Sequence, residues 1–258
     1  MTGTPTGLRR FARPAPASRG PNPVTPTTGN MPGADMPTAN AAAANAPVRN
    51  AATTPSSAEA GPDVERCEMC RAELDDRHGH VVDLEKRSLV CTCRACYLLF
   101  FSPGAGRGRY RAVPEDVHHD PDHSLAASDW DALQVPVGTA FFFDNSDLGR
   151  VVGSYPSPGG ATECELDLAE WQRLAEQYPL FGALDPDVQA IFASRTDDGF
   201  EYFRVPIDVC YALVGQVRLR WRGLDGGDEI RTTLATFVDD LRRRSQEWDA
   251  STDSAGWA

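Results

Sequence analysis

The chain has 258 residues, which is long enough for one large domain or two smaller ones with a substantial buried core. It carries 25 basic and 37 acidic side chains, and its net charge of -12 argues against nucleic acid or an anionic membrane surface as the main partner. No stretch approaches the roughly 18 uninterrupted apolar residues of a membrane helix, so no membrane insertion is expected.

Residues 1–60 differ from the rest of the chain in composition. They contain five arginines against two acids, a segment charge of +3, and 10 of the 20 prolines. So few large apolar side chains cannot offset the entropy of ordering, and we expect a disordered arm rich in Pro, Ala and Thr. Arg9 and Arg10 resemble the start of an export signal, but Pro14 and Pro16 interrupt the apolar stretch that such a signal needs. We therefore expect a cytoplasmic protein.

A cysteine cluster follows the arm. Two CxxC pairs are separated by 22 residues, close to zinc-ribbon spacing. Each pair points two sulfurs the same way, so together they supply a tetrahedral set that suits zinc or a single iron. Expected strands at 80–84 and 88–90 would form a hairpin that brings the second pair beside the first. We predict a zinc-ribbon-like metal lobe over 61–113, with a structural site whose ligands are Cys67, Cys70, Cys93 and Cys96.

Neighbouring residues offer alternatives at this site. Cys91, two residues before the second pair, is an alternate ligand or a thiol near the metal, and His78 or His80 could replace one sulfur. Arg71 and Tyr97 stand where rubredoxins and many zinc ribbons have glycine, which favours zinc over iron. Disulfides are a further alternative, but seven cysteines are an odd number, and CxxC pairs in a cytoplasmic protein are rarely oxidised.

Two loops are expected after the metal lobe's cysteines. Following a predicted strand at 97–101, the segment 103–109 is rich in glycine and arginine, which suits either a phosphate-binding loop or a flexible turn. Phosphate-binding loops normally open a helix, but a strand is predicted at 110–113, so we interpret the segment as a flexible turn. The next loop combines carboxylates with His118, His119 and His123. This loop is either a solvated segment or a site for a divalent cation.

Residues 124–248 are predicted to form an α+β domain of antiparallel strands and three helices, followed by a disordered tail at 249–258. Asp167 and Glu170 resemble a capping box before an amphipathic helix that ends at Pro179. Loop segments are expected between these elements, including one that contains Cys164. The predicted strands lie at 137–143, 150–155, 188–194 and 200–205, the last two joined by an Asp-Gly turn.

Two helices are expected to close the domain. The first begins near Pro206, and Ile207, Cys210, Val214, Val217 and Trp221 form an apolar stripe along it. The second is expected from about Asp228 to Trp248. Cys210 on the stripe is better explained as a buried small residue than as a nucleophile.

No catalytic constellation emerges from the sequence. Glu163 and Asp208 are carboxylates that acid–base chemistry could use, but surface or capping roles explain them better.

The chain resembles a bacterial family of unknown function whose genes lie beside those of uptake nickel–iron hydrogenases in actinobacteria. The resemblance covers about 64–248 and implies a hydrogenase accessory protein or electron-transfer partner. It is carried by Cys67–Cys70, Val90–Cys96 with the following Leu98–Phe100, Tyr155–Glu163, and the segment from Pro206–Asp208 to Trp221–Gly223.

Two functions follow as hypotheses. In the first, the protein is a non-enzymatic accessory that binds a protein partner, and a structural zinc holds its small lobe together. In the second, the same cysteines hold iron and the protein is a rubredoxin-like one-electron carrier. An enzyme acting through Cys210, Glu163 or Asp208 is a weaker third hypothesis.

Overall fold

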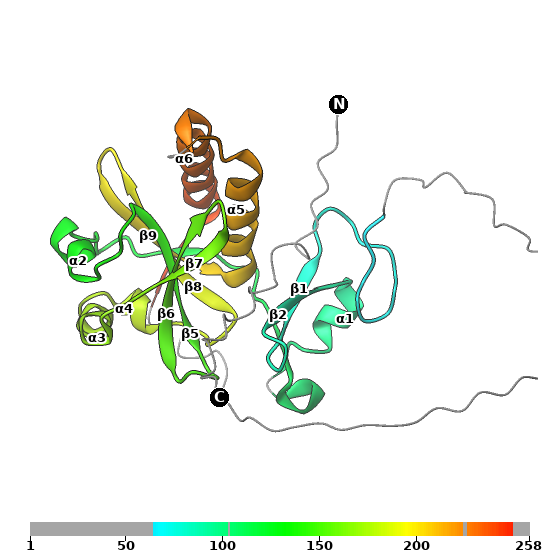
Figure 1. Ribbon diagram of the computed structural model, residues 1–258. Helices are drawn as coiled ribbons and strands as arrows, with labels where there is room; N and C mark the ends of the chain where they lie inside the picture. Colours follow the sequence, from blue (N-terminus) through cyan, green and yellow to red (C-terminus); the bar gives the residue numbers. More distant parts are fainter. Residues whose placement is uncertain (1–63, 103, 224–225, 250–258) are drawn as a thin grey trace, which may run out of the picture. The chain divides into compact units, whose positions relative to one another are not determined.

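The computed structural model describes residues 64–102, 104–223 and 226–249 (Figure 1). The arm predicted over 1–60 and nearly all of the tail predicted over 249–258 lie outside these residues. The described part is an α+β structure with two separate sheets, as the sequence predicts. Within it, no helix combines the length and apolar character needed to cross a membrane.

A small antiparallel sheet carries the cysteine-rich part of the chain. Its strands are β1 (Gly79–Asp83), β2 (Ser88–Thr92) and β3 (Tyr110–Ala112), in the order β2-β1-β3. The predicted hairpin is confirmed, since Asp83 pairs with Ser88 and Gly79 pairs with Thr92. A 3-10 turn, η2 (Ala105–Gly108), lies within the predicted glycine-rich turn.

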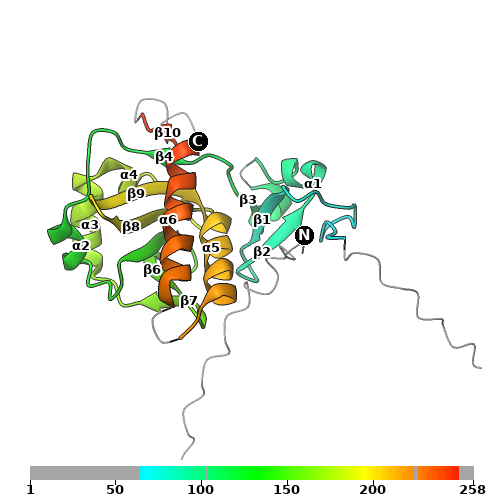
Figure 2. The ribbon, with the colours of Figure 1, turned by 90° about the horizontal axis from the view of Figure 1, so that it is seen from above.

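The strand predicted at 97–101 is wrong. Residues Arg94–Leu98 form the short helix α1 beside the small sheet (Figure 2). The Tyr97 N–H donates to the Cys93 carbonyl at 2.9 Å, and the Tyr97 hydroxyl donates to the Val113 carbonyl at 2.8 Å. The ring lies so close to β1 that a Cβ at Gly79 would be 2.6 Å from it. The run of apolar residues predicted a strand. The segment is a helix instead, with the Tyr97 backbone bonded to Cys93 and its hydroxyl to Val113.

The second sheet has seven strands in the order β10-β4-β9-β8-β5-β6-β7. Neighbouring strands are antiparallel except β10 and β4, which are parallel. The predicted Asp-Gly hairpin is confirmed by the pairing of Thr196 with Gly199. The strands are β4 (His118–His119), β5 (Thr139–Asn145), β6 (Arg150–Ser157), β7 (Gly160–Cys164), β8 (Gln189–Thr196), β9 (Gly199–Pro206) and β10 (Gln246–Glu247).

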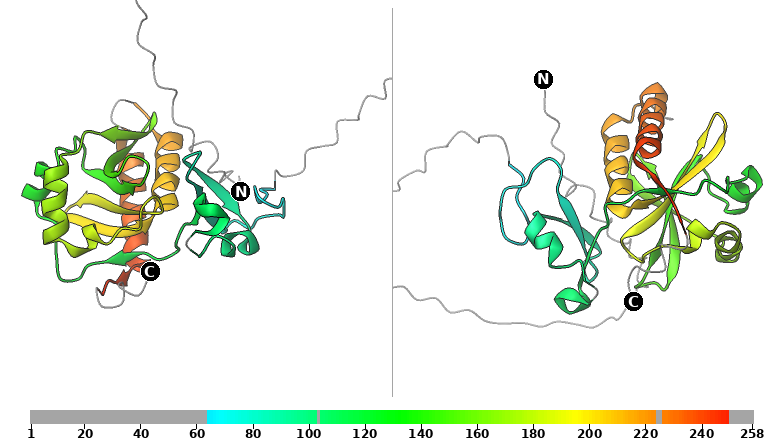
Figure 3. Two further views of the ribbon diagram at one scale, coloured as in Figure 1. Left: turned by 90° about the horizontal axis from the view of Figure 1, so that it is seen from below. Right: turned by 180° about the vertical axis from the view of Figure 1, so that it is seen from behind.

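Helices cover both faces of this sheet (Figures 1 and 3). Helices α5 (Ile207–Arg220) and α6 (Gly227–Arg244) pack on one face, in a core that includes Phe141, Phe192 and Cys210. Helices α2 (Ala127–Ala132), α3 (Leu168–Gln177) and α4 (Pro179–Gly182) pack on the other face, around Trp130 and Phe142. The α5-side core also contains Val82 and Val113, from β1 and from just after β3, so the small sheet contributes to the domain core.

Several local predictions are confirmed and others are wrong. Asp167 caps α3 by accepting hydrogen bonds from the backbone of Ala169 and Glu170, and the α5 stripe is buried from Ile207 to Val217.

The segment around Cys164 is a strand and not a loop, because it pairs along β6. The last long helix ends at Arg244, not Trp248. Ser245 has an extended backbone conformation, and the two residues after it pair with β4.

Candidate metal centre

The first CxxC pair lies in a tight loop that is closed by backbone hydrogen bonds. The Arg71 N–H donates to the Cys67 carbonyl and the Cys67 N–H donates to the Ala72 carbonyl, both at 2.8 Å. Arg71 has a φ of 68°, so it takes the left-handed conformation that glycine adopts most readily. The turn therefore has the backbone expected of a cysteine knuckle, although the sequence has arginine there.

The second CxxC pair has a different local structure. Cys93 is the residue that precedes α1, and Cys96 lies in the first turn of that helix. The pair is thus presented by a helix start and not by a second knuckle. The hairpin β1–β2 connects the two pairs and returns the chain to the first loop, where the Glu68 N–H donates to the Cys91 carbonyl at 2.9 Å.

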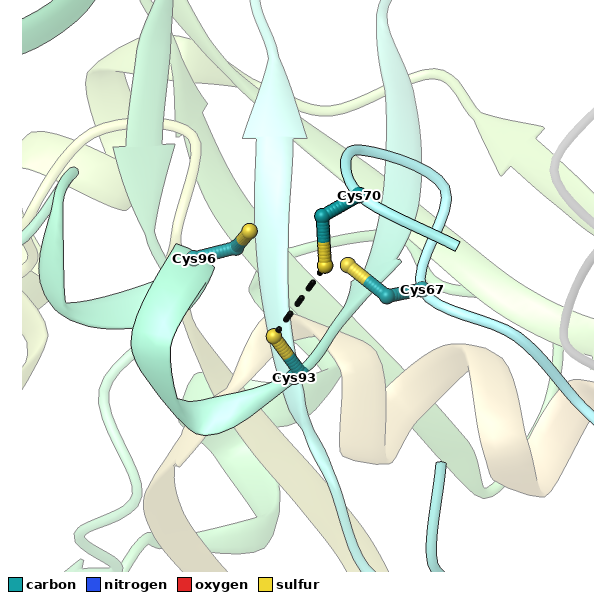
Figure 4. A group of neighbouring side chains, drawn as sticks. All are labelled: Cys67, Cys70, Cys93 and Cys96. Carbon is teal, nitrogen blue, oxygen red and sulfur yellow. Dashed lines mark hydrogen bonds between the residues drawn. The ribbon is translucent and has the colours of Figure 1, made fainter. Parts of the chain in front are cut away.

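The four predicted ligands come together in space (Figure 4). The sulfur atoms of Cys67, Cys70, Cys93 and Cys96 all lie within 4.8 Å of one another, and those of Cys70 and Cys93 are 3.6 Å apart. A tetrahedral ion with metal–sulfur bonds of about 2.3 Å needs sulfur–sulfur distances of about 3.8 Å. The arrangement therefore fits one ion. A cluster of several irons would hold the thiolates further apart.

The protein environment differs among the four thiols. Burial acts to raise the pKa of Cys67, but hydrogen bonds from the backbone N–H groups of Cys93, Cys70 and Met69 outweigh it and lower that pKa to about 6. Burial, with the neighbouring thiols, raises the pKa of Cys96 to about 12. Four thiolates at these distances repel one another, and a bound cation removes this repulsion. The donor set thus fits a thiolate-preferring metal ion.

The alternate ligands named from the sequence lie in another group. The side chains of His78, His80 and Cys91 offer ligand atoms within 4.8 Å of one another, separately from the four cysteines. The sequence places these residues near the CxxC pairs, but only the register of the β1–β2 hairpin shows that they meet. The pairing within the predicted hairpin, which sets His80 opposite Cys91, is the sequence signal for this group.

The loop histidines do not gather into a site within the described chain. The His123 ring contacts Asp120 at 2.9 Å, and Arg204 donates to the His118 ring at 3.3 Å. His119 pairs through its backbone with β10.

The two carboxylates have separate partners, and the two remaining cysteines are buried. Glu163 pairs with Arg150 at 3.1 Å, and Asp208 contacts His80 at 2.7 Å. Burial raises the pKa of the Cys210 thiol, which is fully buried as its stripe predicts. Burial likewise raises the pKa of Cys164. Neither thiol has the exposed, low-pKa setting of a nucleophile.

Fold and site together define an α+β protein with a small cysteine-rich sheet, beside which four cysteines are placed to hold one metal ion. The chain belongs to a family of unknown function (DUF5947), whose model matches residues 66–245. That range contains both CxxC pairs and ends just after α6. Neither a curated protein nor a solved structure matches the chain.

Proposed function

We propose that the protein is a non-enzymatic accessory protein in which a zinc ion at Cys67, Cys70, Cys93 and Cys96 holds the knuckle, the hairpin and α1 together. The observation that carries this proposal is the convergence of four sulfur atoms from two separate segments to within 4.8 Å. Four protein ligands leave no open coordination position, which is typical of a structural ion. Zinc is favoured because Tyr97 lies inside a helix, where a rubredoxin-type site would have a second knuckle with glycine.

The surface next to the site supports a role in binding a protein partner. Directly after the second pair, Leu98, Leu99 and Phe101 are 52%, 67% and 47% exposed. Exposed large apolar side chains that gather in one short segment are typical of interaction sites. Tyr97 and Phe101 also line an open groove of about 1040 Å³. The family resemblance stated above makes hydrogenase maturation machinery the first partner to test.

Metal analysis of protein purified without a tag tests the site. We expect a colourless four-sulfur site that contains zinc and is lost in Cys70→Ser, a substitution at an exposed ligand. Visible thiolate-to-iron absorption that disappears in the same variant would instead establish the one-electron carrier. Absence of any metal at these cysteines would overturn both.

The partner surface is tested separately. Leu99→Asp should abolish capture of the hydrogenase assembly proteins by the purified chain while leaving its metal content unchanged. Leu219→Asp is the matched control, because Leu219 on α5 is also exposed, at 55%, and lies far along the sequence from the metal site. Equal capture by both variants would contradict a role for the segment around Leu99.

A further inference from the structure

We propose that His78, His80 and Cys91 form a second metal site, distinct from the four-cysteine site, that binds one divalent ion of the zinc class. The geometry begins at the start of β1. His80 is the second residue of β1 and His78 lies just before the strand, and the centroids of their rings are 4.9 Å apart. Cys91 is directly opposite His80 in the β1–β2 register, which places these two side chains on the same face of the hairpin.

Both histidines are oriented as metal ligands usually are. The His80 Nδ1 lies 2.7 Å from Asp208 Oδ2, and the His78 Nδ1 lies 2.9 Å from the Asp75 carbonyl oxygen. An ionised carboxylate and a carbonyl can only accept, so each Nδ1 carries the proton and each Nε2 keeps a lone pair. A carboxylate or carbonyl that holds the outer nitrogen of a ligating histidine is the usual second shell of a metal site.

The two inner nitrogens are the observation that points to a ligand. The Nε2 atoms of His78 and His80 are buried, and neither has a hydrogen-bond partner. His80 is only 8% exposed. Adding a proton to each atom would not satisfy it, because this would leave two buried N–H donors without acceptors. A cation bound to both lone pairs satisfies them, and Cys91, 1% exposed, adds a sulfur to the set.

The surroundings of Cys91 complete the proposed coordination. Its Sγ lies 3.5 Å from Glu65 Oε1, and its backbone N–H donates to Glu68 Oε1 at 3.2 Å. Two imidazoles, one thiolate and a nearby carboxylate form a mixed set that suits zinc and similar divalent ions. Because three side chains from the hairpin fill three positions, the fourth is left to Glu65 or to a water held by it. In this respect the site differs from the closed four-cysteine site.

The inference does not depend on the four-cysteine site, and the two are separated experimentally. The full chain is stripped of metal, reduced, and titrated anaerobically with Co²⁺, while thiolate-to-cobalt absorption and bound metal per chain are measured. We expect two Co²⁺ per wild-type chain. Cys70→Ser should keep only the equivalent at the second site, and His78→Ala should keep only the four-sulfur equivalent.

Controls make the outcome decisive. His123→Ala removes a histidine of an exposed loop and should keep two equivalents. Cys91→Ala should match His78→Ala, and if it fails to fold, His78→Ala, which removes a half-buried side chain, still tests the site. The proposal is overturned if the wild-type chain binds a single Co²⁺ that His78→Ala leaves in place. It is also overturned if His78→Ala retains both equivalents. A single equivalent that Cys70→Ser keeps and His78→Ala loses would support this site and refute the four-cysteine site.

Discussion

The imidazole of His80 and the carboxylate of Asp208 are joined by a 2.7 Å hydrogen bond across 128 residues of sequence. It connects β1 of the small sheet with the first turn of α5 in the large domain. Asp208 is itself fixed, because its other oxygen accepts from the Val209 N–H at 2.8 Å. The carboxylate therefore orients the His80 ring from outside the metal lobe.

Asp208→Ala should weaken Co²⁺ binding at the proposed second site by about 10- to 100-fold, because the second shell that orients His80 is lost. Isothermal titration of the metal-free chain measures this, and the four-sulfur equivalent should be unaffected. Asp228→Ala is the matched control, since Asp228 is also an acid in the first turn of a helix but pairs with Arg231. Unchanged affinity at the proposed second site in Asp208→Ala would contradict the assigned role.

Removal of metal should loosen the small sheet while leaving the large one intact. The cysteine-rich part has few buried apolar side chains, chiefly Val81, Val82, Tyr97 and Val113. A structural ion in such a region supplies folding free energy directly. Hydrogen exchange after chelation should therefore show faster exchange over 66–97 and little change in β8 and β9. Equal loss of protection in both sheets would argue that the ion supports the whole fold.

Arg71→Gly should strengthen the knuckle. A non-glycine residue in the left-handed region costs about 1–2 kcal/mol, and glycine at φ 68° largely avoids this cost. We expect the free energy of unfolding to rise by about 1 kcal/mol and chelator resistance to increase. Arg77→Gly serves as control, because Arg77 is exposed and has no positive φ, so glycine there should be neutral or destabilising. Lower stability of Arg71→Gly would show that the arginine side chain itself matters.

Asp129→Asn should destabilise the α2–α3 side of the domain. Asp129 accepts hydrogen bonds from the Tyr178 hydroxyl at 2.6 Å and from Arg173 at 2.8 Å. Burial acts to raise the pKa of Asp129, but these two donors outweigh it and lower that pKa. Asparagine removes the charge that strengthens both bonds, so the loss at pH 7 should be about 1–3 kcal/mol.

The same carboxylate gives a pH dependence with a definite sign. A pKa that is lower in the folded than in the unfolded state stabilises the fold above the unfolded value, about 3.9 for Asp. That contribution is lost as the pH falls through the folded pKa. Denaturant unfolding should therefore show the wild-type and Asp129→Asn curves converging below about pH 4. Asp131→Asn on the exposed side of α2 should follow the wild type at every pH. Parallel curves for wild type and Asp129→Asn would contradict the assignment.

Local sequence rules recovered much of the architecture. Cysteine spacing predicted the four sulfurs that meet, the Asp-Gly turn predicted β8–β9, and the Asp167 cap predicted the start of α3. These features depend on contacts between residues close in sequence, or on the fixed chemistry of a metal site. Features of this kind can be predicted without knowledge of the tertiary fold.

The errors arose where distant contacts decide the structure. α1 replaces an expected strand because Tyr97 is anchored by Val113, and α6 ends early because residues 246–247 pair with β4. The second group of ligands also includes a distant contact, although the predicted hairpin sets His80 opposite Cys91. His80 is oriented by Asp208, a partner that no local pattern could supply.

Strand β10 has a consequence for synthesis of the chain on the ribosome. It is the outer neighbour of β4 in the seven-stranded sheet. Strand β4 has only two residues and follows the small sheet in the chain. Until residues 246–248 emerge, the outer edge of β4 has no strand to cover it, although every other strand of the sheet has already been made. Because β9, the inner neighbour of β4, is complete only at Pro206, this edge stays uncovered while α5 and α6 are made, and such edges pair readily with other chains. A message truncated before codon 246 should accordingly yield a product prone to aggregation, even though both groups of candidate metal ligands would be complete.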